Sequence, residues 1–339
     1  MAYSYAKAGV NVDQVKGIQL KVAELLRGTL SKDVIMGAGH YAGLLKVGSK
    51  TIAIHTDGVG SKVLVAQALE KYDTVGIDAI AMNVNDLACL GARPIAIVDY
   101  LAIEKTDDKM ILEIMKGVAK GAKEAKCAVV GGETAIVPDL IKGLGGKGFD
   151  LSVTCIGEVE GPMITGKGMK ENDAIIGIES SGIHSNGYTL ARRVLLKGKN
   201  ANNDARLKQM LIPTKIYSNA VLEILKKVKS VKGLAHITGG AFSKLQRIGA
   251  YSKKGFLLNN MPRPLSIFRQ LQKEGAIPER EMYRTFNMGV GFCVVCGGKD
   301  AERVVAICKR YNMRSQQIGK IINTQGVYLW KKGKLTNLS

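Results

Sequence analysis

Short apolar runs that favour β-strands alternate with longer amphipathic stretches that favour helices along the sequence. A strand-like run at 50–55 precedes a helical stretch at 63–72, and the same order recurs at 174–178 and 188–196. Such a chain must bury the apolar face of each sheet against helices. The pattern therefore predicts an α/β or α+β fold.

Glycine and proline interrupt this alternation at 161–168. The segment has the first glycines and the lysine of a phosphate-binding P-loop, but Gly168 stands where the Mg²⁺-binding hydroxyl would be, which favours a linker. A chain of 339 residues is long enough for about two domains. We therefore expect an N-terminal domain at 1–165 and a C-terminal domain at 170–339.

Composition limits the class of protein. The net charge of +20 invites a nucleic-acid interpretation, but lysine and arginine are spread along the chain and aromatic residues make up only 5%. A solvated basic surface that attracts phosphorylated substrates is favoured, so nucleic acid is an unlikely partner. The sequence shows neither a signal peptide nor a membrane span. Together with six scattered cysteines, this predicts a cytoplasmic protein without a disulfide framework.

The spacing of Cys293 and Cys296 suits a metal or redox site, but both lie in an apolar run at 291–296 that predicts a buried strand. Residues three apart on a strand point to opposite faces, so a structural role is favoured.

An acidic, glycine-rich loop at 55–62 follows the strand-like run at 50–55. Glycines allow backbone N–H groups to face an anion, and the helix that follows adds its positive end. Lys62 can neutralise phosphate, and the Asp57 carboxylate suits Mg²⁺. The alternative for Asp57 is a capping role in a tight turn.

Polar residues also interrupt the apolar helix predicted at 74–90. Asn83, Asn85 and Asp86 lie within it, and Asp78 lies one to two turns earlier. Buried polar groups are costly unless they have partners, so this cluster suits either a metal–phosphate site or a hydrogen-bonded packing network. Glu133, expected at the end of a strand at 128–130, adds a further acid at an edge where α/β proteins bind ligands.

The four histidines, His40, His55, His184 and His236, all lie in or beside glycine-rich loops. This placement predicts that at least one acts at the functional site. Loops 182–187 and 238–240 each precede a predicted helix and offer N–H groups to a phosphate. In the first loop, we expect Ser185 or Asn186 to cap the helix.

Six motifs in a fixed order, at 5–13, 55–62, 76–87, 130–135, 182–188 and 236–240, give the chain a specific resemblance. It resembles the aminoimidazole ribonucleotide synthetase family, the phosphoribosylformylglycinamidine cyclo-ligases of purine biosynthesis, over nearly its whole length. The resemblance implies a two-domain fold whose N-terminal strands build a shared β-barrel in a homodimer. It also implies ATP-driven closure of formylglycinamidine ribonucleotide to aminoimidazole ribonucleotide through a phosphorylated formamide, with ADP and phosphate released.

The resemblance also suggests roles for particular residues. Asp57 and Asp86 are expected to be catalytic and, with Asp78, to hold Mg²⁺, while His184 is a further catalytic candidate. Candidate ATP-binding residues are Gly37, Gly39, Thr56, Gly58, Lys62, Asn85, Gly132 and Glu133. Candidate residues for the substrate phosphate are Ser185, Asn186, Gly187, Thr238, Gly239 and Gly240.

The loop at 37–43 departs from the resemblance, because the bacterial pattern has glycines around a phenylalanine there. Two other classes stay open as alternatives. One is another ATP-using relative, such as a selenophosphate synthetase, a thiamine-monophosphate kinase or a hydrogenase-maturation factor, and the other is a basic nucleic-acid-binding protein.

Overall fold

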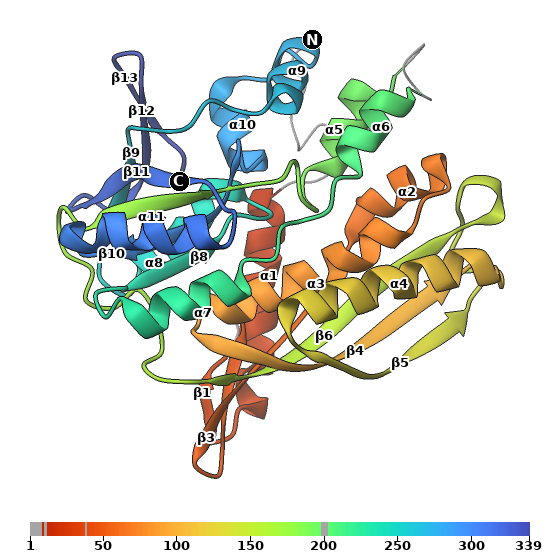
Figure 1. The fold of residues 1–339 in the computed structure, drawn as a ribbon, viewed down its shortest axis with the longest axis horizontal. Coiled ribbons are helices and arrows are strands. Elements are labelled where there is room, and N and C mark those ends of the chain that lie inside the picture. Colours follow the sequence, from red (N-terminus) through yellow and green to blue (C-terminus); the bar gives the residue numbers. More distant parts are fainter. Residues whose placement is uncertain (1–8, 10–11, 38, 198–202) are drawn as a thin grey trace.

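The computed structural model of the chain describes residues 9, 12–37, 39–197 and 203–339. Its strands form two separate sheets, one of six strands and one of seven, and helices pack against both (Figure 1). The expected α/β architecture is therefore confirmed. The motif at 5–13 lies largely outside the described residues.

The first sheet has the strand order β1-β2-β3-β6-β4-β5. Its strands are β1 (Val34–Met36), β2 (Gly43–Val47), β3 (Lys50–Gly58), β4 (Ala92–Ile103), β5 (Ala128–Ile136) and β6 (Phe149–Val159). All neighbouring pairs are antiparallel except β4 and β5, which run parallel. The helix α4 (Asp108–Ala125) makes the crossover between these two parallel strands.

Helix α3 (Asp73–Ala88) is central to the molecule, since it packs on β3, β4 and β6 and also contacts α7 (Ser218–Lys227) and β8 (Gly233–His236) of the second half. Every residue from 75 to 88 is buried, which explains the nearly continuous apolar sequence. Glycines let α3 and α4 approach closely, because a Cβ on Gly117 would lie 1.9 Å from the carbonyl oxygen of Asp73. The polar residues of α3 are thus held between the two halves.

The second sheet has the strand order β13-β12-β9-β11-β7-β10-β8. Its strands are β7 (Ala174–Glu179), β8 (Gly233–His236), β9 (Gly255–Leu258), β10 (Val290–Cys296), β11 (Ser315–Ile322), β12 (Gly326–Lys331) and β13 (Lys334–Asn337). Strand β10 is buried throughout, and Cys293 and Cys296 within it are unpaired. The buried strand predicted for the run at 291–296 is confirmed.

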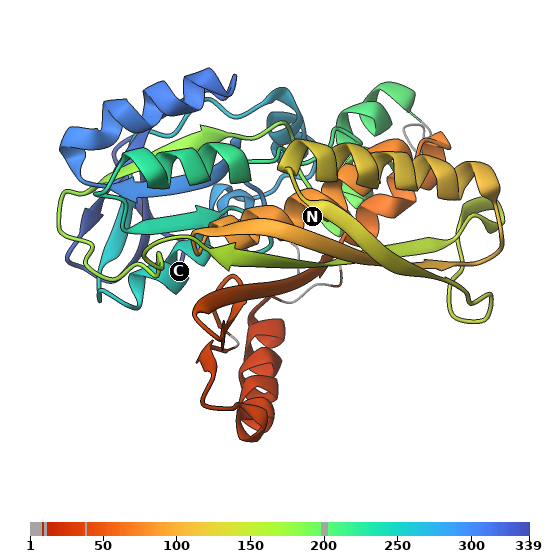
Figure 2. The same cartoon turned by 60° about the horizontal axis from the view of Figure 1, so that its bottom comes forward.

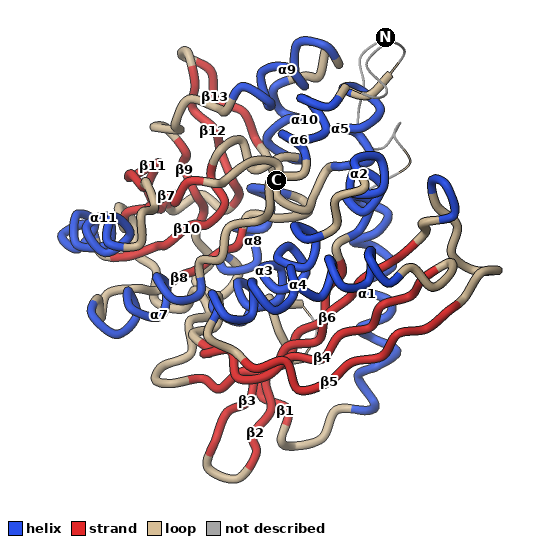
Figure 3. The backbone as a smooth tube through the Cα atoms, turned by 45° about the vertical axis from the view of Figure 1, so that its right-hand side comes forward, coloured by secondary structure: helices blue, strands red, loops and turns tan. Residues whose placement is uncertain are grey.

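Helices cover both faces of this second sheet. Helix α11 (Ala301–Arg310) contacts β7, β11 and α7 (Ser218–Lys227), whereas α8 (Leu245–Gly249) contacts β8, β9 and β12. The other helices of this half are α5 (Tyr188–Leu195), α6 (Asp204–Met210), α9 (Ser266–Glu274) and α10 (Glu279–Thr285). Figure 3 shows the two sheets on either side of α3.

Two further helices belong to the first half. Helix α2 (Val63–Leu69) ends three residues before the predicted limit, because Glu70 adopts a left-handed conformation with φ of 48°. Helix α1 (Val12–Leu26) projects away from the body of the molecule together with β1 (Figure 2). None of the described helices combines the length and the apolar character needed to cross a membrane.

Candidate functional site

Asp57 and Asp86 lie at the junction of β3 and α3, and two neighbouring side chains link them. The Nδ1 atom of His55 is 2.9 Å from Oδ1 of Asn83, and its Nε2 atom is 3.5 Å from Oδ2 of Asp86. The Asn83 side chain in turn donates to the carbonyl oxygen of Asp57 at 3.2 Å. The polar residues expected on this helix and the acidic loop therefore form one cluster.

The second half of the chain adds His236, the last residue of β8. Its Nδ1 atom lies 2.7 Å from Oδ1 of Asp86, and its Nε2 atom lies 3.4 Å from the amide nitrogen of Asn85. Because an amide nitrogen only donates, Nε2 must accept and Nδ1 must carry the proton. Burial also lowers the pKa of His236, against the opposing effect of Asp86. We therefore assign a neutral imidazole that donates to Asp86.

The two carboxylates differ in their electrostatic environment. Burial by itself would raise the pKa of Asp86, but the charge of Lys244 and the hydrogen bond from His236 lower it to about 2. Burial and the negative charge of Asp86 raise the pKa of Asp57. Asp86 is thus a fixed anion at neutral pH, and Asp57 bears a charge that its surroundings do not fully balance.

Lys244 is a residue that the sequence analysis missed. It ends the 3-10 helix Ala241–Lys244, where its ammonium group donates to Thr238 Oγ1 and lies 5.7 Å from the ring centre of Tyr41. Its charge acts on both Asp57 and Asp86. The available signal was a lysine four residues after Gly240, in the turn that directly follows a glycine-rich loop.

The carboxylates of Asp57 and Asp86 suit one hard divalent cation that is held together with the phosphates of a bound ligand. No group of three or more histidine, cysteine, aspartate or glutamate side chains forms a ready metal site among the residues described. Mg²⁺, however, usually takes one or two protein carboxylates and completes its shell with water and substrate phosphates. Asp57 and Asp86 offer two carboxylates, and the unbalanced charge of Asp57 is of the kind that a cation relieves.

Lys62 and Asp78 form a buried ion pair with 2.7 Å between Nζ and Oδ2, and neither side chain is exposed. Lys62 also donates to the carbonyl oxygens of His184 and Ile212. This arrangement differs from the sequence prediction of a triphosphate-binding lysine and a metal-binding aspartate. A buried charge needs an opposite charge beside it, and the pairing of Lys62 with Asp78 accounts for the burial of both side chains.

Asp78 also fixes the loop before α5. Its Oδ1 atom accepts hydrogen bonds from Thr214 N and Oγ1, at 2.7 and 2.6 Å, and from Ser185 Oγ at 3.1 Å. Ser185 is therefore not the cap of α5. That position belongs to Gly187, which has a φ of 80°, and no side chain caps the helix. The capping prediction for Ser185 or Asn186 was wrong.

His184 and Asn85 are buried in the same region. The backbone of His184 has a φ of 67°, its Nε2 atom accepts from Ser181 N at 3.2 Å, and its Nδ1 atom has no hydrogen-bond partner within the described structure. Asn85 donates to the Lys215 carbonyl and accepts from Tyr217 N. Both side chains, expected to face ligands, instead hold the loops of the second half.

Three predicted nucleotide contacts lie apart from the carboxylates. The Thr56 side chain is on the opposite face of β3 from that of Asp57, where it bonds to Val153 O. Gly132 is three strands away from Asp57 in the sheet, roughly 14 Å at normal strand spacing. Glu133 does not end a strand, because β5 continues to Ile136.

The remaining predicted residues lie at the end of β3 or in glycine-rich loops. Gly58 N donates to Asp57 Oδ1 at 2.8 Å. Asp57 therefore also stabilises the turn in which it lies, which is close to the capping role that was its alternative. Gly239 lies beside Asn186, since a Cβ on Gly239 would be 2.9 Å from Oδ1 of Asn186. Gly240 has a φ of 81° and begins the helical turn that carries Lys244.

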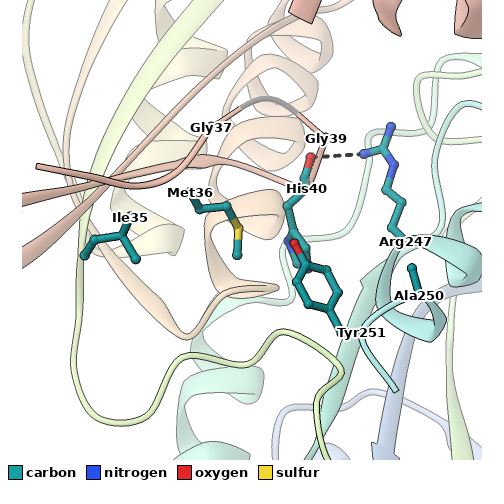
Figure 4. A pocket seen from close by; sticks show the side chains of 8 residues that line it. All are labelled: Ile35, Met36, Gly37, Gly39, His40, Arg247, Ala250 and Tyr251. Carbon is teal, nitrogen blue, oxygen red and sulfur yellow. Dashed lines mark hydrogen bonds between the residues drawn. The ribbon is translucent and has the colours of Figure 1, made fainter. Parts of the chain in front are cut away.

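Gly37 and Gly39 line a cavity of about 530 Å³ beside β1 (Figure 4). The other lining residues are Ile35, Met36, His40, Arg247, Ala250 and Tyr251. Arg247 donates to the carbonyl oxygen of His40 at 3.4 Å, so a hydrogen bond joins two of the lining residues. The loop at 37–43 that departs from the bacterial pattern is therefore next to a cavity.

Comparison with protein families gives two matches that together cover most of the chain. Residues 39–159 match "AIR synthase related protein, N-terminal domain", and residues 170–332 match "AIR synthase related protein, C-terminal domain".

Two archaeal relatives are similar over almost their full length. Phosphoribosylformylglycinamidine cyclo-ligase of Methanocaldococcus jannaschii is 44% identical over 331 residues, which cover 95% of this chain and 93% of that protein. The protein of the same name from Pyrococcus furiosus is 46% identical and covers 97% and 98%.

Solved structures share the fold at lower identity. The HypE-HypF complex contains a chain with a TM-score of 0.70 and 20% identity, covering 94% of this chain and 98% of that one. The structure titled "AaThiL complexed with AMPPCP and TMP" has a TM-score of 0.65 and 18% identity, covering 93% and 94%. These two likenesses concern the fold alone.

Proposed function

This chain belongs to the family of AIR synthase related proteins, and we propose that it is a phosphoribosylformylglycinamidine cyclo-ligase. It would use ATP to close formylglycinamidine ribonucleotide to aminoimidazole ribonucleotide and release ADP and phosphate. The observation that carries this proposal is the 42–46% identity to proteins of that name, over at least 92% of each protein's own length. Solved structures of two of the alternative classes, HypE and thiamine-monophosphate kinase, are similar at only 18–20% identity.

The reaction requires a poor leaving group to be activated. The formamide oxygen attacks the γ-phosphorus of ATP, the bond to the β–γ bridging oxygen breaks, and ADP leaves. The amidine nitrogen then attacks the activated carbon, the ring closes, and the phosphorylated oxygen departs as phosphate. No covalent bond to the protein is needed, so the protein contributes positioning and charge stabilisation.

The charged residues of the site are suited to positioning and charge stabilisation. Asp86 stays ionised because Lys244 and His236 hold its pKa at about 2, against the opposing effect of burial. The positive charge of Lys244 acts on the carboxylates of Asp57 and Asp86, so its ammonium group can stabilise negative charge on a transferred phosphoryl group. His236 fixes the orientation of Asp86 from the second half of the chain. We propose Asp57, Asp86 and Lys244 as the triphosphate side of the site.

Mg²⁺ is part of the proposal, with Asp57 and Asp86 as its carboxylate ligands. When bound, the ion would neutralise phosphate charge during transfer. Asp78 is not included, because its carboxylate is already bonded to Lys62, Thr214 and Ser185.

The substrate phosphate is proposed to bind between the loop before α5 and the loop at 238–240. The buried Nδ2 atom of Asn186 has no hydrogen-bond partner among the described residues, and the Oδ1 atom of this side chain packs closely against Gly239, where a Cβ would clash with it. The backbone of Ser185, Gly187, Thr238 and Gly240 completes this candidate seat. We propose that His184 holds the loop before α5 in place rather than transfers a proton, because its carbonyl oxygen accepts from Lys62 and its Nε2 atom accepts from Ser181 N.

A homodimer is the proposed assembly, because the first sheet has an uncovered face. Helices α3 and α4 cover one face, while apolar side chains remain exposed on or beside the other. These residues are Ile95, Val98, Tyr100, Val130, Ile136 and Ile156. An exposed apolar patch next to the edge strand β5 is typical of an interface. A cytoplasmic location is also proposed, in keeping with six unpaired cysteines.

An assay of ADP release tests the function. We expect release to require formylglycinamidine ribonucleotide and Mg²⁺ together, with aminoimidazole ribonucleotide formed in equal amount. If ADP appeared at the same rate without the ribonucleotide, the cyclo-ligase assignment would be wrong. Salt-dependent binding of DNA or RNA without ATP turnover would favour the nucleic-acid alternative.

A further inference from the structure

Lys244 and Arg247 are two neighbouring cations that bond to neutral groups. Lys244 donates to Thr238 Oγ1, and Arg247 donates to the carbonyl oxygen of His40 at 3.4 Å (Figure 4). Neither hydrogen bond cancels a positive charge. The two side chains therefore bring positive charge from the second half of the chain to the edge of the candidate site.

Asp86 does not neutralise Lys244 by direct contact. Within the described structure its carboxylate pairs with His55 and His236, at 3.5 and 2.7 Å, and the charge of Lys244 acts on it from further away. The ammonium group of Lys244 thus stays available to a second anion.

The two cations also repel each other. They are three positions apart in consecutive helical turns, so their side chains leave the helix on the same side. Burial lowers the pKa of Lys244, and the charge of Arg247 adds to this effect, against the opposing charge of Asp86. A further group is needed to hold both cations side by side.

The ring of Tyr41 lies beside both of them. Nζ of Lys244 is 5.7 Å from the ring centre, and the guanidinium carbon of Arg247 is 5.4 Å from it. Both distances are within the roughly 6 Å over which the negative face of an aromatic ring attracts a cation. Tyr41 precedes β2 and only 1% of the residue is exposed, so a fixed ring of the first half contacts two cations of the second.

The hydroxyl group of Tyr41 does not explain this contact. It is buried and has no hydrogen-bond partner among the described residues. Burial raises the pKa of this hydroxyl, which therefore stays protonated and uncharged at neutral pH. The attraction for the two cations comes from the ring.

We propose that Tyr41 is a positioning residue, whose ring holds Lys244 and Arg247 side by side so that both cations meet the phosphates of the nucleotide. This inference rests on the proposed ATP-dependent function. It adds Arg247 to the triphosphate side and a residue of the first half that prepares both cations without itself touching a phosphate. Cations that are held in place before the ligand arrives lose less freedom when it binds.

Calorimetric titration of the full-length protein with inorganic tripolyphosphate and Mg²⁺ tests the proposal. Tyr41→Phe keeps the ring, and its affinity should stay within about threefold of the wild type. A fully fluorinated phenylalanine at position 41 keeps the shape of the ring but reverses the charge of its face, so the affinity should fall roughly tenfold or more. Partly fluorinated phenylalanines should give intermediate values.

Tyr72 is the matched control for this series. Only 2% of it is exposed, its hydroxyl also has no partner within the described structure, and its ring packs edge-on against Phe149 with 5.8 Å between ring centres. It precedes α3, roughly 20 Å along the helix axis from Asp86. The fully fluorinated phenylalanine at position 72 should leave the affinity for tripolyphosphate unchanged.

Steady-state kinetics give a second measurement. The fully fluorinated ring at position 41 should raise the KM for ATP by a factor similar to the loss of affinity and leave the KM for formylglycinamidine ribonucleotide near the wild-type value. A rise in the KM for the ribonucleotide alone would overturn the assignment of the two cations to the nucleotide.

Equal affinities of Tyr41→Phe and its fully fluorinated form would overturn the proposal, because packing would then be the only role of the ring. A tenfold loss already in Tyr41→Phe would overturn it too, as would failure of the wild type to bind tripolyphosphate. These titrations need no turnover. Absence of wild-type turnover would therefore remove the cyclo-ligase assignment, while the titrations would still decide the role of Tyr41.

Discussion

Nδ1 of His236 donates a hydrogen bond to Oδ1 of Asp86 across 2.7 Å, and so joins β8 of the second sheet to the central helix α3. Both side chains are buried, and Asn85 completes the hydrogen bonding of the ring. A change in the packing of the two halves would therefore move the carboxylate as well. The geometry of the candidate metal ligand depends on both halves of the chain.

The first prediction concerns acid stability. Burial would raise the pKa of Asp86, but Lys244 and His236 lower it to about 2, below its value in the unfolded chain. Its stabilisation is thus complete above about pH 4 and is lost as the pH falls towards 2. We expect about 2 kcal/mol of the free energy of unfolding to disappear over this range in the wild type and not in Asp86→Asn. Urea unfolding at several pH values measures it, and parallel curves would contradict the assignment.

The second prediction is that Asp57→Asn has opposite effects on activity and stability. Burial and the charge of Asp86 raise the pKa of Asp57, so its ionised form destabilises the ligand-free fold at neutral pH. The amide removes that repulsion, and the thermal midpoint without ligand should rise, on the order of 1 °C. Turnover should fall at least about hundredfold, since a proposed metal ligand is lost. Near-normal activity would remove Asp57 from the site.

The third prediction concerns the buried pair of Lys62 and Asp78. Lys62→Met leaves a buried carboxylate without its cation, which should reduce the free energy of unfolding by about 3–5 kcal/mol. Adding Asp78→Asn should restore part of the loss, because the neutral amide still accepts from Thr214. Denaturant unfolding is the measurement.

A matched control for that experiment is Lys227→Met. Lys227 pairs with Glu223 at 2.7 Å on an exposed face of α7, where such a pair contributes about 0.3–0.5 kcal/mol. If Lys62→Met lowered the free energy of unfolding no more than this control does, the Lys62–Asp78 pair would not be shielded from water in solution.

The fourth prediction tests the dimer. Val130 is exposed on the edge strand β5, and a lysine there places charge in the proposed interface. Val130→Lys should shift the mass measured by light scattering from dimer to monomer. Leu112→Lys, on exposed α4 across the sheet, should leave the mass unchanged. A wild-type monomer, or a dimer that survives Val130→Lys, would exclude this face as the interface.

Local sequence patterns were sufficient for much of the fold. The alternation of strands and helices, the buried strand around Cys293 and the turn after Gly240 all follow from side-chain periodicity or glycine conformation. The continuation of β5 through Gly131 and Gly132 did not follow, because pairing with β4 stabilises glycines that a single strand would not favour.

The amino-acid sequence is enough to show which charged residues lie within apolar segments, and its ordered motifs identified the family. Tertiary structure alone decided which of those charges meet. Lys62 and Asp78 pair in the interior, whereas Asp86 meets His236 and Lys244 from the other half of the chain. The physical reason is that burying a charge is costly unless an opposite charge or a hydrogen-bond donor lies beside it. For Asp86 that partner is His236, which lies 150 positions away along the chain, so only the folded structure brings the two together.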